Sequence, residues 1–264
     1  MDRETPLIIT ATPNICWLQP AVEHPRSPVE MAAEAARCEQ AGASILHMHA
    51  EDWAGTVAAV RSATDLIVQC GMSSLPIPER TEVFAARADM ISIITSHHDE
   101  AFADHDIHVL HPREELVEYA NLQRETGVRL EYEIWHTGAI WNLEWLIARG
   151  VVDPPYFTSI FFGWPGGSWS PPTVEEYHYR RRQLPAESVA TVSIMDERQI
   201  DILAAAIVAG DHVRVGTEDL PFGRDGRLAP THQLVAEVAE LAAALGRPLA
   251  TPAQARAMTG VRNS

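Results

Sequence analysis

The sequence predicts a single (β/α)8 barrel, the TIM-barrel fold, and three observations lead to that prediction. The chain has 264 residues, a length that suits one such barrel. Short apolar runs rich in β-branched residues alternate with longer amphipathic stretches, a pattern typical of βα units around a parallel sheet. Eight such runs occur, and we expect strands over residues 7–12, 44–49, 66–71, 90–96, 129–136, 156–163, 188–195 and 212–219. No domain boundary is visible, so residues 1–264 are expected to form one barrel domain with a C-terminal extension.

An amphipathic segment follows each expected strand, and the segment over residues 29–40 carries the clearest helix signals. Ser27 can cap its start, Pro28 suits a first helical turn, and Gly42 follows its end. A second clear helix is expected over residues 231–245. An open doubly wound sheet is the alternative architecture. The first strand, however, is not followed by a glycine-rich phosphate loop, and the eight repeats favour closure.

The charge balance excludes some classes of partner. Acidic residues outnumber basic ones by 36 to 20, and a net charge of −16 argues against nucleic acid or an anionic membrane as partner. The longest apolar runs are too short to span a bilayer and no signal segment opens the chain, so we expect a cytoplasmic protein. Cys16, Cys38 and Cys70 are odd in number and lack metal-type spacing, which indicates buried structural thiols.

The composition contains no lysine, because all 20 basic residues are arginines. Schiff-base chemistry, whether of the aldolase kind or with pyridoxal phosphate, needs a lysine amine and is therefore excluded. Carbonyl chemistry in this chain would need a metal ion, and in a barrel it would occur at the carboxyl ends of the strands.

The second expected strand ends in a histidine pair that could bind such an ion. His47 and His49 are two residues apart, so both imidazoles point to the same face at the end of the strand, and Met48 points away. Two neutral imidazoles so placed can share a divalent ion. The alternative is a pair of core histidines whose hydrogen bonds are satisfied within the protein.

The eighth expected strand ends in two carboxylates. Alternation puts Arg214, Gly216 and Glu218 on one face, with Asp219 at the start of the loop and Gly216 leaving room for a ligand. A catalytic zinc normally takes three protein ligands, so Glu218 is the natural third ligand beside the histidine pair. Arg214 and Asp219 are then available for substrate binding and proton transfer. The alternative is an ordinary surface ion pair.

Other polar residues follow strands three, four and five. Glu131 and Glu133 share a face of an apolar strand, where unpaired burial is costly, so they need partners such as Arg214. Either glutamate could act in catalysis or in a structural salt bridge. The loops after strands three and four offer hydroxyls to a substrate carboxylate, although such residues also simply form turns. The expected contacts are Ser73, Ser74 and Thr95.

Two further motifs have a less definite use. His97 and His98 are consecutive, so both cannot easily bind one ion, and we expect them in a loop or beside the metal ligands. Residues 161–167 form an aromatic, glycine-rich segment after strand six. This segment could line a cofactor channel, cover the site or pack between subunits.

Five motifs, spread nearly from end to end of the chain, form a recognisable set: residues 41–43 (AGA), 47–49 (HMH), 131–133 (EYE), 210–219 (GDHVRVGTED) and 250–256 (ATPAQAR). In these motifs the sequence resembles the β-keto acid cleavage enzyme family, whose founding activity cleaves 3-keto-5-aminohexanoate. The motif over residues 210–219 is the most specific, and the histidine pair alone would not identify the family.

The resemblance implies a (β/α)8 barrel, commonly a homotetramer, with zinc held by His47, His49 and Glu218. It also implies a reaction in which a β-keto acid and acetyl-CoA give acetoacetate and a new CoA thioester. Asp219 would support proton removal, steered by Arg214 and by one of the strand-five glutamates.

The sequence departs from the family pattern at three places. Residues 50–53 (AEDW) carry an acidic residue where the family usually has an arginine, and His232 stands where an asparagine is common. The loop after strand one has Ile15 and Trp17 where relatives can carry a glutamate that reads a substrate amine. Trp17 is therefore expected to contact a less cationic side chain of the keto acid.

Two other functions remain open. A zinc-dependent hydrolase or retro-aldol lyase could use the same barrel without CoA, although hydrolases commonly carry the histidine pair on strand one. A catalytically silent metal-binding or acyl-CoA-binding homologue would not require Arg214, Glu218 and Asp219 together.

Overall fold

The computed structural model confirms a closed barrel of eight parallel strands in the order β1-β10-β9-β8-β7-β4-β3-β2. It describes residues 4–16, 18–19, 22–72, 77–100, 107–163 and 169–262. Each expected strand, identified as a short apolar run, overlaps one barrel strand. The barrel strands are β1 Ile9–Ala11, β2 Ile45–Met48, β3 Ile67–Gly71, β4 Met90–Ile94, β7 Arg129–Ile134, β8 Tyr156–Phe162, β9 Ser188–Ile194 and β10 His212–Val215.

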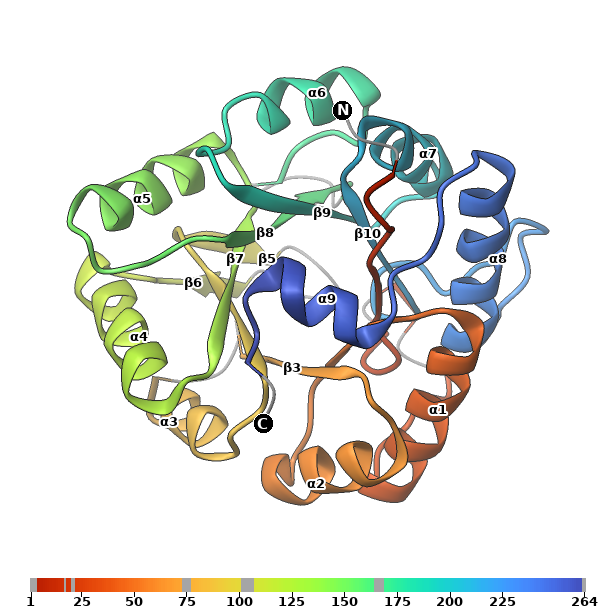
Figure 1. Ribbon diagram of the computed structural model, residues 1–264, viewed down its shortest axis with the longest axis horizontal. Helices are drawn as coiled ribbons and strands as arrows, with labels where there is room; N and C mark the ends of the chain where they lie inside the picture. Colours follow the sequence, from red (N-terminus) through yellow and green to blue (C-terminus); the bar gives the residue numbers. More distant parts are fainter. Residues whose placement is uncertain are drawn as a thin grey trace.

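Helices surround the barrel as an outer ring (Figure 1). The helix predicted over residues 29–40 is α1, Pro28–Ala41. The Ser27 side chain accepts from the backbone N–H of Glu30, and Gly42 ends the helix in the left-handed conformation at φ 111°. The remaining helices are α2 Trp53–Ala63, α3 Ile77–Ala85, α4 Arg113–Thr126, α5 Thr137–Ala148, α6 Val174–Arg181, α7 Gln199–Ala209, α8 Thr231–Ala244 and α9 Pro252–Thr259.

The apolar core has two parts. The larger part lies between the strands and the helix ring and contains the outward-facing strand residues, such as Met48. The smaller part fills the amino end of the barrel, where Ile8, Ile45 and Phe157 pack with Ala255 of α9. The C-terminal extension therefore closes the amino end of the barrel, and α9 lies across it in Figure 1.

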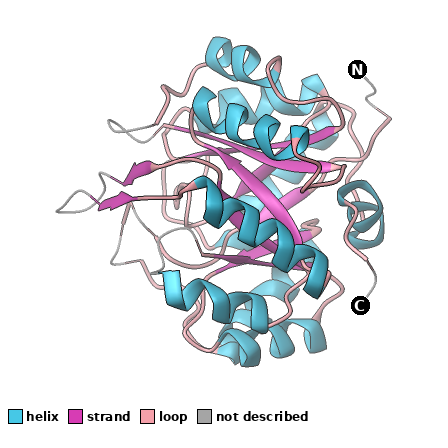
Figure 2. Cartoon of the chain, turned by 90° about the vertical axis from the view of Figure 1, so that its left-hand side faces the viewer, coloured by secondary structure: helices cyan, strands magenta, loops and turns pink. Residues whose placement is uncertain are grey.

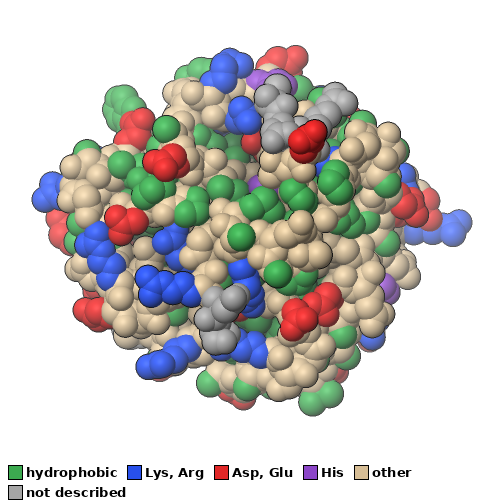
Figure 3. Space-filling view, in the orientation of Figure 1, with side chains coloured by type: hydrophobic (Ala, Val, Ile, Leu, Met, Phe, Trp, Pro, Cys, Tyr) green, Lys and Arg blue, Asp and Glu red, His purple; other side chains and the backbone are tan. Residues whose placement is uncertain are grey.

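The two ends of the barrel differ in character. Figure 2 shows α9 at one end and a two-stranded hairpin projecting from the other. The hairpin, β5 His98–Glu100 paired antiparallel with β6 Ile107–Val109, lies between β4 and α4 and was not predicted. Figure 3 shows acidic and basic side chains interspersed over the end covered by α9. Active sites of such barrels form at the opposite, carboxyl end.

Two smaller predictions are also tested by the structure. Cys16, Cys38 and Cys70 are buried free thiols, as expected. Within the described segments, no helix combines the length and the apolar character that a membrane span requires.

Candidate metal centre and active site

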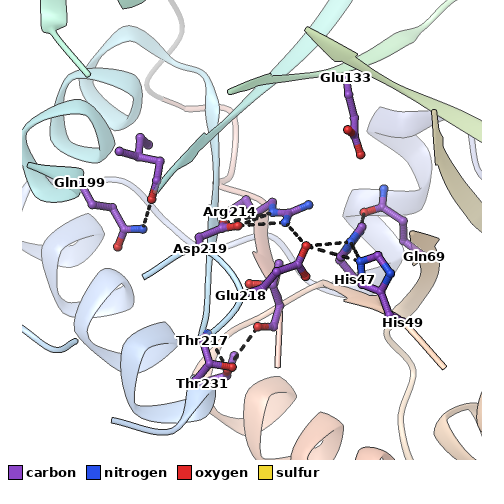
Figure 4. Close-up of polar contacts among 12 residues, drawn as sticks. His47, His49, Gln69, Glu133, Gln199, Arg214, Thr217, Glu218, Asp219 and Thr231 are labelled. Carbon is purple, nitrogen blue, oxygen red and sulfur yellow. Dashed lines mark hydrogen bonds and ion pairs between the residues drawn. The ribbon is translucent and has the colours of Figure 1, made fainter. Parts of the chain in front are cut away.

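His47 and His49 bring their Nε2 atoms within 3.3 Å of each other at the carboxyl end of β2 (Figure 4). His47 Nδ1 lies 2.7 Å from the Gln69 Oε1 atom on β3. Because a carbonyl oxygen only accepts, this contact places the proton on Nδ1 and turns the Nε2 lone pair toward His49. The Nε2 lone pair of His47 can therefore accept a hydrogen bond from His49 Nε2–H or bind an ion.

Glu218 completes a cluster of three possible metal ligands, because the fold places it beside the histidine pair. Its Oε1 atom is 3.5 Å from the Nε2 atoms of both His47 and His49, and the ligand atoms all lie within 4.8 Å of one another. Three donors held about 2.1 Å from one ion at tetrahedral angles are separated by about 3.4 Å. The observed spacing of the three atoms therefore suits a tetrahedral ion.

The local fold explains how Glu218 reaches the cluster. Strand β10 ends at Val215, earlier than expected, and the Leu220 N–H donates to the Gly216 carbonyl at 3.0 Å to form a tight turn. The turn, rather than strand alternation, directs Glu218 and Asp219 to the same side. The expectation that Gly216 leaves room for a ligand is wrong. A Cβ atom at this position would lie 2.3 Å from the carbonyl oxygen of Thr12, so the glycine permits close approach of β1.

Arg214 binds both carboxylates of the turn. Its Nη2 atom donates to Glu218 at 2.7 Å, and its Nε and Nη2 atoms donate to Asp219 at 2.9 to 3.2 Å. The side chains of Arg214 and Asp219 are 1% and 0% exposed, so this is not a surface ion pair. Burial raises the pKa of Asp219 above its ordinary value, although Arg214 opposes the shift. Asp219 is thus a fixed carboxylate with increased affinity for a proton.

The structure offers three further signs that the cluster fits a metal ion. Burial would raise the pKa of Glu218, but the Arg214 guanidinium helps to hold it well below its usual range, so the carboxylate is ionised. Its Oε2 atom is buried without a hydrogen-bond partner among the described residues. A Cβ atom on Gly71 would lie 2.5 Å from the His49 ring, so only a glycine leaves space for both imidazoles.

The two glutamates of β7 differ in their surroundings. The Glu131 carboxylate is fully buried and has no hydrogen-bond partner in the described part of the chain. Burial, followed by the neighbouring Glu133, raises the pKa of Glu131 to about 8 although Arg214 opposes the shift. Glu133 accepts a hydrogen bond from Trp135 Nε1 at 2.9 Å and points toward the cluster (Figure 4). The expected pairing with Arg214 is not observed as a hydrogen bond for either glutamate.

The expected substrate contacts are only partly within the described residues. Trp17, Ser73 and Ser74 lie outside them. The Thr95 hydroxyl donates to the backbone carbonyls of Glu133 and Ala139 at 3.0 and 3.2 Å, so it is already engaged. The next hydroxyl, that of Ser96, is buried and makes no hydrogen bond to a described residue.

The sequence interpretation missed an aromatic cluster near this end of the barrel. His98 belongs to β5, and its ring packs 5.2 Å from His111 and 4.4 Å from Trp135. Trp135 in turn packs against Phe161 at 5.3 Å and against Trp169 at 4.1 Å. The apolar composition around residues 161–167 was the available signal for this cluster, but residues 164–168 are not described.

The sequence interpretation also missed two carboxamides. Gln69 contacts the His47 ring, and the side chain of Asn14 contacts the backbone of His49. Both contacts join segments that are distant in the sequence, and no sequence motif predicts them.

A closed parallel barrel with two histidines, a glutamate and a buried arginine–aspartate pair at one end defines the class: a barrel protein with a candidate catalytic metal site. A family model described as beta-keto acid cleavage enzyme matches residues 6–261. The chain therefore belongs to the β-keto acid cleavage enzyme family.

Individual relatives agree with this assignment. The chain is 30% identical over 275 residues to a 3-keto-5-aminohexanoate cleavage enzyme of Acetoanaerobium sticklandii, over 97% of this chain and 98% of the relative. It is 23% identical to a 3-dehydrocarnitine:acetyl-CoA trimethylamine transferase of Rhizobium meliloti, over 97% and 96% of the two chains. The solved complex of ObcA with oxaloacetate has the same fold, with a TM-score of 0.72, 16% identity and coverage of 91% of this chain and 68% of the other.

Proposed function

We propose that this chain is a zinc-dependent β-keto acid cleavage enzyme, which converts a β-keto acid and acetyl-CoA into acetoacetate and a new CoA thioester. One observation carries the proposal. The cluster of His47, His49 and Glu218 lies directly beside the Arg214–Asp219 pair, because Arg214 binds both Glu218 and Asp219. Family membership and a relative whose name includes acetyl-CoA support the choice of co-substrate.

The donor set favours zinc as the ion. Two imidazole nitrogens and one carboxylate oxygen form a ligand set that zinc takes at catalytic sites, where a fourth position stays open for substrate. Zinc bound there would supply a Lewis acid that stabilises negative charge on the keto oxygen of the substrate. With no lysine in the chain, amine-based activation of that carbonyl is not available.

Asp219 is the base of the proposed reaction. Its carboxylate would take a proton from the substrate carbon between the ketone and the carboxylate, and its raised pKa favours that transfer. Arg214 fixes both carboxylate oxygens of Asp219 and keeps the group from rotating away. The resulting carbanion attacks the thioester carbonyl of acetyl-CoA and displaces CoA thiolate, which then adds to the former ketone carbon. Carbon–carbon cleavage releases the new CoA thioester and an acetoacetate carbanion, which takes the proton back from Asp219.

We assign the remaining polar groups near the cluster to positioning the substrate. Glu131, with a pKa of about 8, is protonated at neutral pH and can donate a hydrogen bond into the barrel interior. Glu133 points toward the cluster and can orient a polar group of the substrate (Figure 4). Ser73, Ser74 and Ser96 are the proposed contacts of the substrate carboxylate, and Trp17 is the proposed contact of its side chain.

The proposal is tested with purified protein of known metal content. The protein is incubated with acetyl-CoA and a panel of β-keto acids with cationic, neutral and acidic side chains, and acetoacetate and the CoA thioester are measured. We expect both products to appear in equal amounts with at least one keto acid, and to disappear after chelation of the metal. Metal-loaded protein that forms no acetoacetate above the enzyme-free control contradicts the proposal and favours a hydrolase or a silent homologue.

A further inference from the structure

We infer that Asn14 is a positioning residue that holds the metal ligand His49 in place through its backbone, an inference that rests on the proposed metal centre. The Asn14 Nδ2 atom donates to the His49 carbonyl at 2.5 Å, and Asn14 Oδ1 accepts from the His49 N–H at 3.0 Å. The asparagine side chain therefore matches both polar groups of one residue. It is buried, with 6% of its surface exposed.

The course of β1 explains why a side chain is needed at this point. The β1–β2 pairing ends at Ala11 opposite Leu46, before β2 reaches His49. On its other side β1 stays paired with β10, and the Thr12 N–H donates to the Val215 carbonyl at 3.1 Å. Pro13 follows and has no backbone N–H to offer. The Asn14 carboxamide supplies two hydrogen bonds to His49, just after β2, where the backbone pairing of β1 with β2 has ended.

Two hydrogen bonds from Asn14 to the backbone of His49 fix the orientation of His49 better than one would. A single hydrogen bond leaves His49 free to rotate about that contact, whereas a donor and an acceptor together restrict the backbone and hence the direction of the imidazole. His47 has a different support, because Gln69 contacts its ring directly. Among the described residues, His49 Nε2 contacts only the other two members of the cluster, so the orientation of its ring depends on its backbone.

The test compares zinc binding by Asn14→Ala, Asn14→Asp and Gln123→Ala, each freed of metal first, in a competition titration with a chelator. Gln123 is the matched control, because its carboxamide accepts from the Leu130 N–H at 2.9 Å and it is also 6% exposed. We expect the zinc affinity of Asn14→Ala to fall by about 10- to 100-fold, the range found when supports of metal ligands are lost. Gln123→Ala should keep the wild-type affinity while losing similar stability of the metal-free protein in urea.

Asn14→Asp separates positioning from space filling. Aspartate has nearly the same shape, but one of its oxygens would face the His49 carbonyl oxygen and repel it. We therefore expect an affinity loss at least as large as that of Asn14→Ala, and wild-type affinity in Asn14→Asp would overturn the inference. Equal losses in Asn14→Ala and Gln123→Ala would also overturn it. If the wild-type protein itself binds no divalent ion, the proposed metal centre fails, which is a different result.

Discussion

Gly71, the last residue of β3, offers a sharp test of the metal centre, because it faces both imidazoles. A Cβ atom built on Gly71 would lie 2.5 Å and 2.6 Å from two atoms of the His49 ring and 2.8 Å from His47 Nε2. Ordinary contacts of a Cβ atom begin at 3.4 Å. In Gly71→Ala, both rings must therefore retreat by about 0.6 to 0.9 Å, since the close contacts are with ring atoms of the buried His47 and the half-buried His49.

The size of this displacement sets the expected effect. Metal–ligand distances are maintained within about 0.2 Å in working sites, so the displaced rings could not both keep their bonds to the ion. Loss of a supporting residue alone reduces metal affinity by about 10- to 100-fold. Direct displacement of ligands should cost at least about 100-fold, or about 2.8 kcal/mol of binding free energy.

The assay measures the zinc dissociation constant of the metal-free variant by chelator competition and its unfolding in urea without metal. Gly223→Ala is the matched control. Its Cβ atom would meet only the carboxylate end of Glu237 within 3.4 Å, and neither Gly71 nor Gly223 has a positive φ. We expect Gly223→Ala to bind zinc as the wild type does. Retention of wild-type affinity by Gly71→Ala would refute the idea that these two rings hold the ion in the observed arrangement.

Three more predictions concern the acidic residues. Glu218→Gln should lower zinc occupancy after dialysis, measured by mass spectrometry of the metal, because a neutral amide is a much weaker ligand than a carboxylate. Asp219→Asn should keep its zinc but lose about 100- to 10,000-fold in kcat, measured by acetoacetate release, because it lacks the proposed base. Glu131→Gln should remove a pH dependence of stability. The folded-state pKa of Glu131, about 8, exceeds its ordinary value of 4.5, so the folded protein binds the proton more tightly. Wild-type stability without metal should therefore fall by up to about 1.4 kcal/mol per pH unit between pH 4.5 and 8, and the glutamine variant should lack this fall.

Each of these predictions has a result that contradicts it. Unchanged zinc content in Glu218→Gln would remove Glu218 from the ligand set. Near-normal turnover in Asp219→Asn would show that another group accepts the proton. Parallel stability curves for Glu131→Gln and the wild type across this pH range would show that Glu131 titrates as an ordinary exposed carboxylate.

Local signals in the sequence were sufficient to predict the helices and strands of the barrel. Ser27 and Gly42 mark the ends of α1 because a cap acts on the backbone within a few residues. Short apolar runs mark the eight barrel strands, and spacing alone puts His47 and His49 on one face at the end of β2. The hairpin β5–β6 was missed because its short strands contain no apolar run.

The arrangement of the site was decided by the tertiary structure. Glu218 was expected at the histidine pair on chemical grounds, but its position depends on the turn after β10, a close contact between Gly216 and Thr12, and Arg214. The surroundings of Glu131 could not be derived, because burial and the position of Arg214 depend on strands distant in sequence.

Asn14 also shows the difference between what the sequence predicts and what the tertiary structure decides. Its residue type is common in turns, and nothing near it in the sequence distinguishes it from an ordinary loop residue. Only the pairing of β1 with β2 brings its carboxamide to His49, 35 residues away along the chain. Residue spacing thus determined which side chains share a strand face, because that depends on local backbone geometry. Contacts between separate strands depend on register and on loop paths, and these are defined only when the strands pack together.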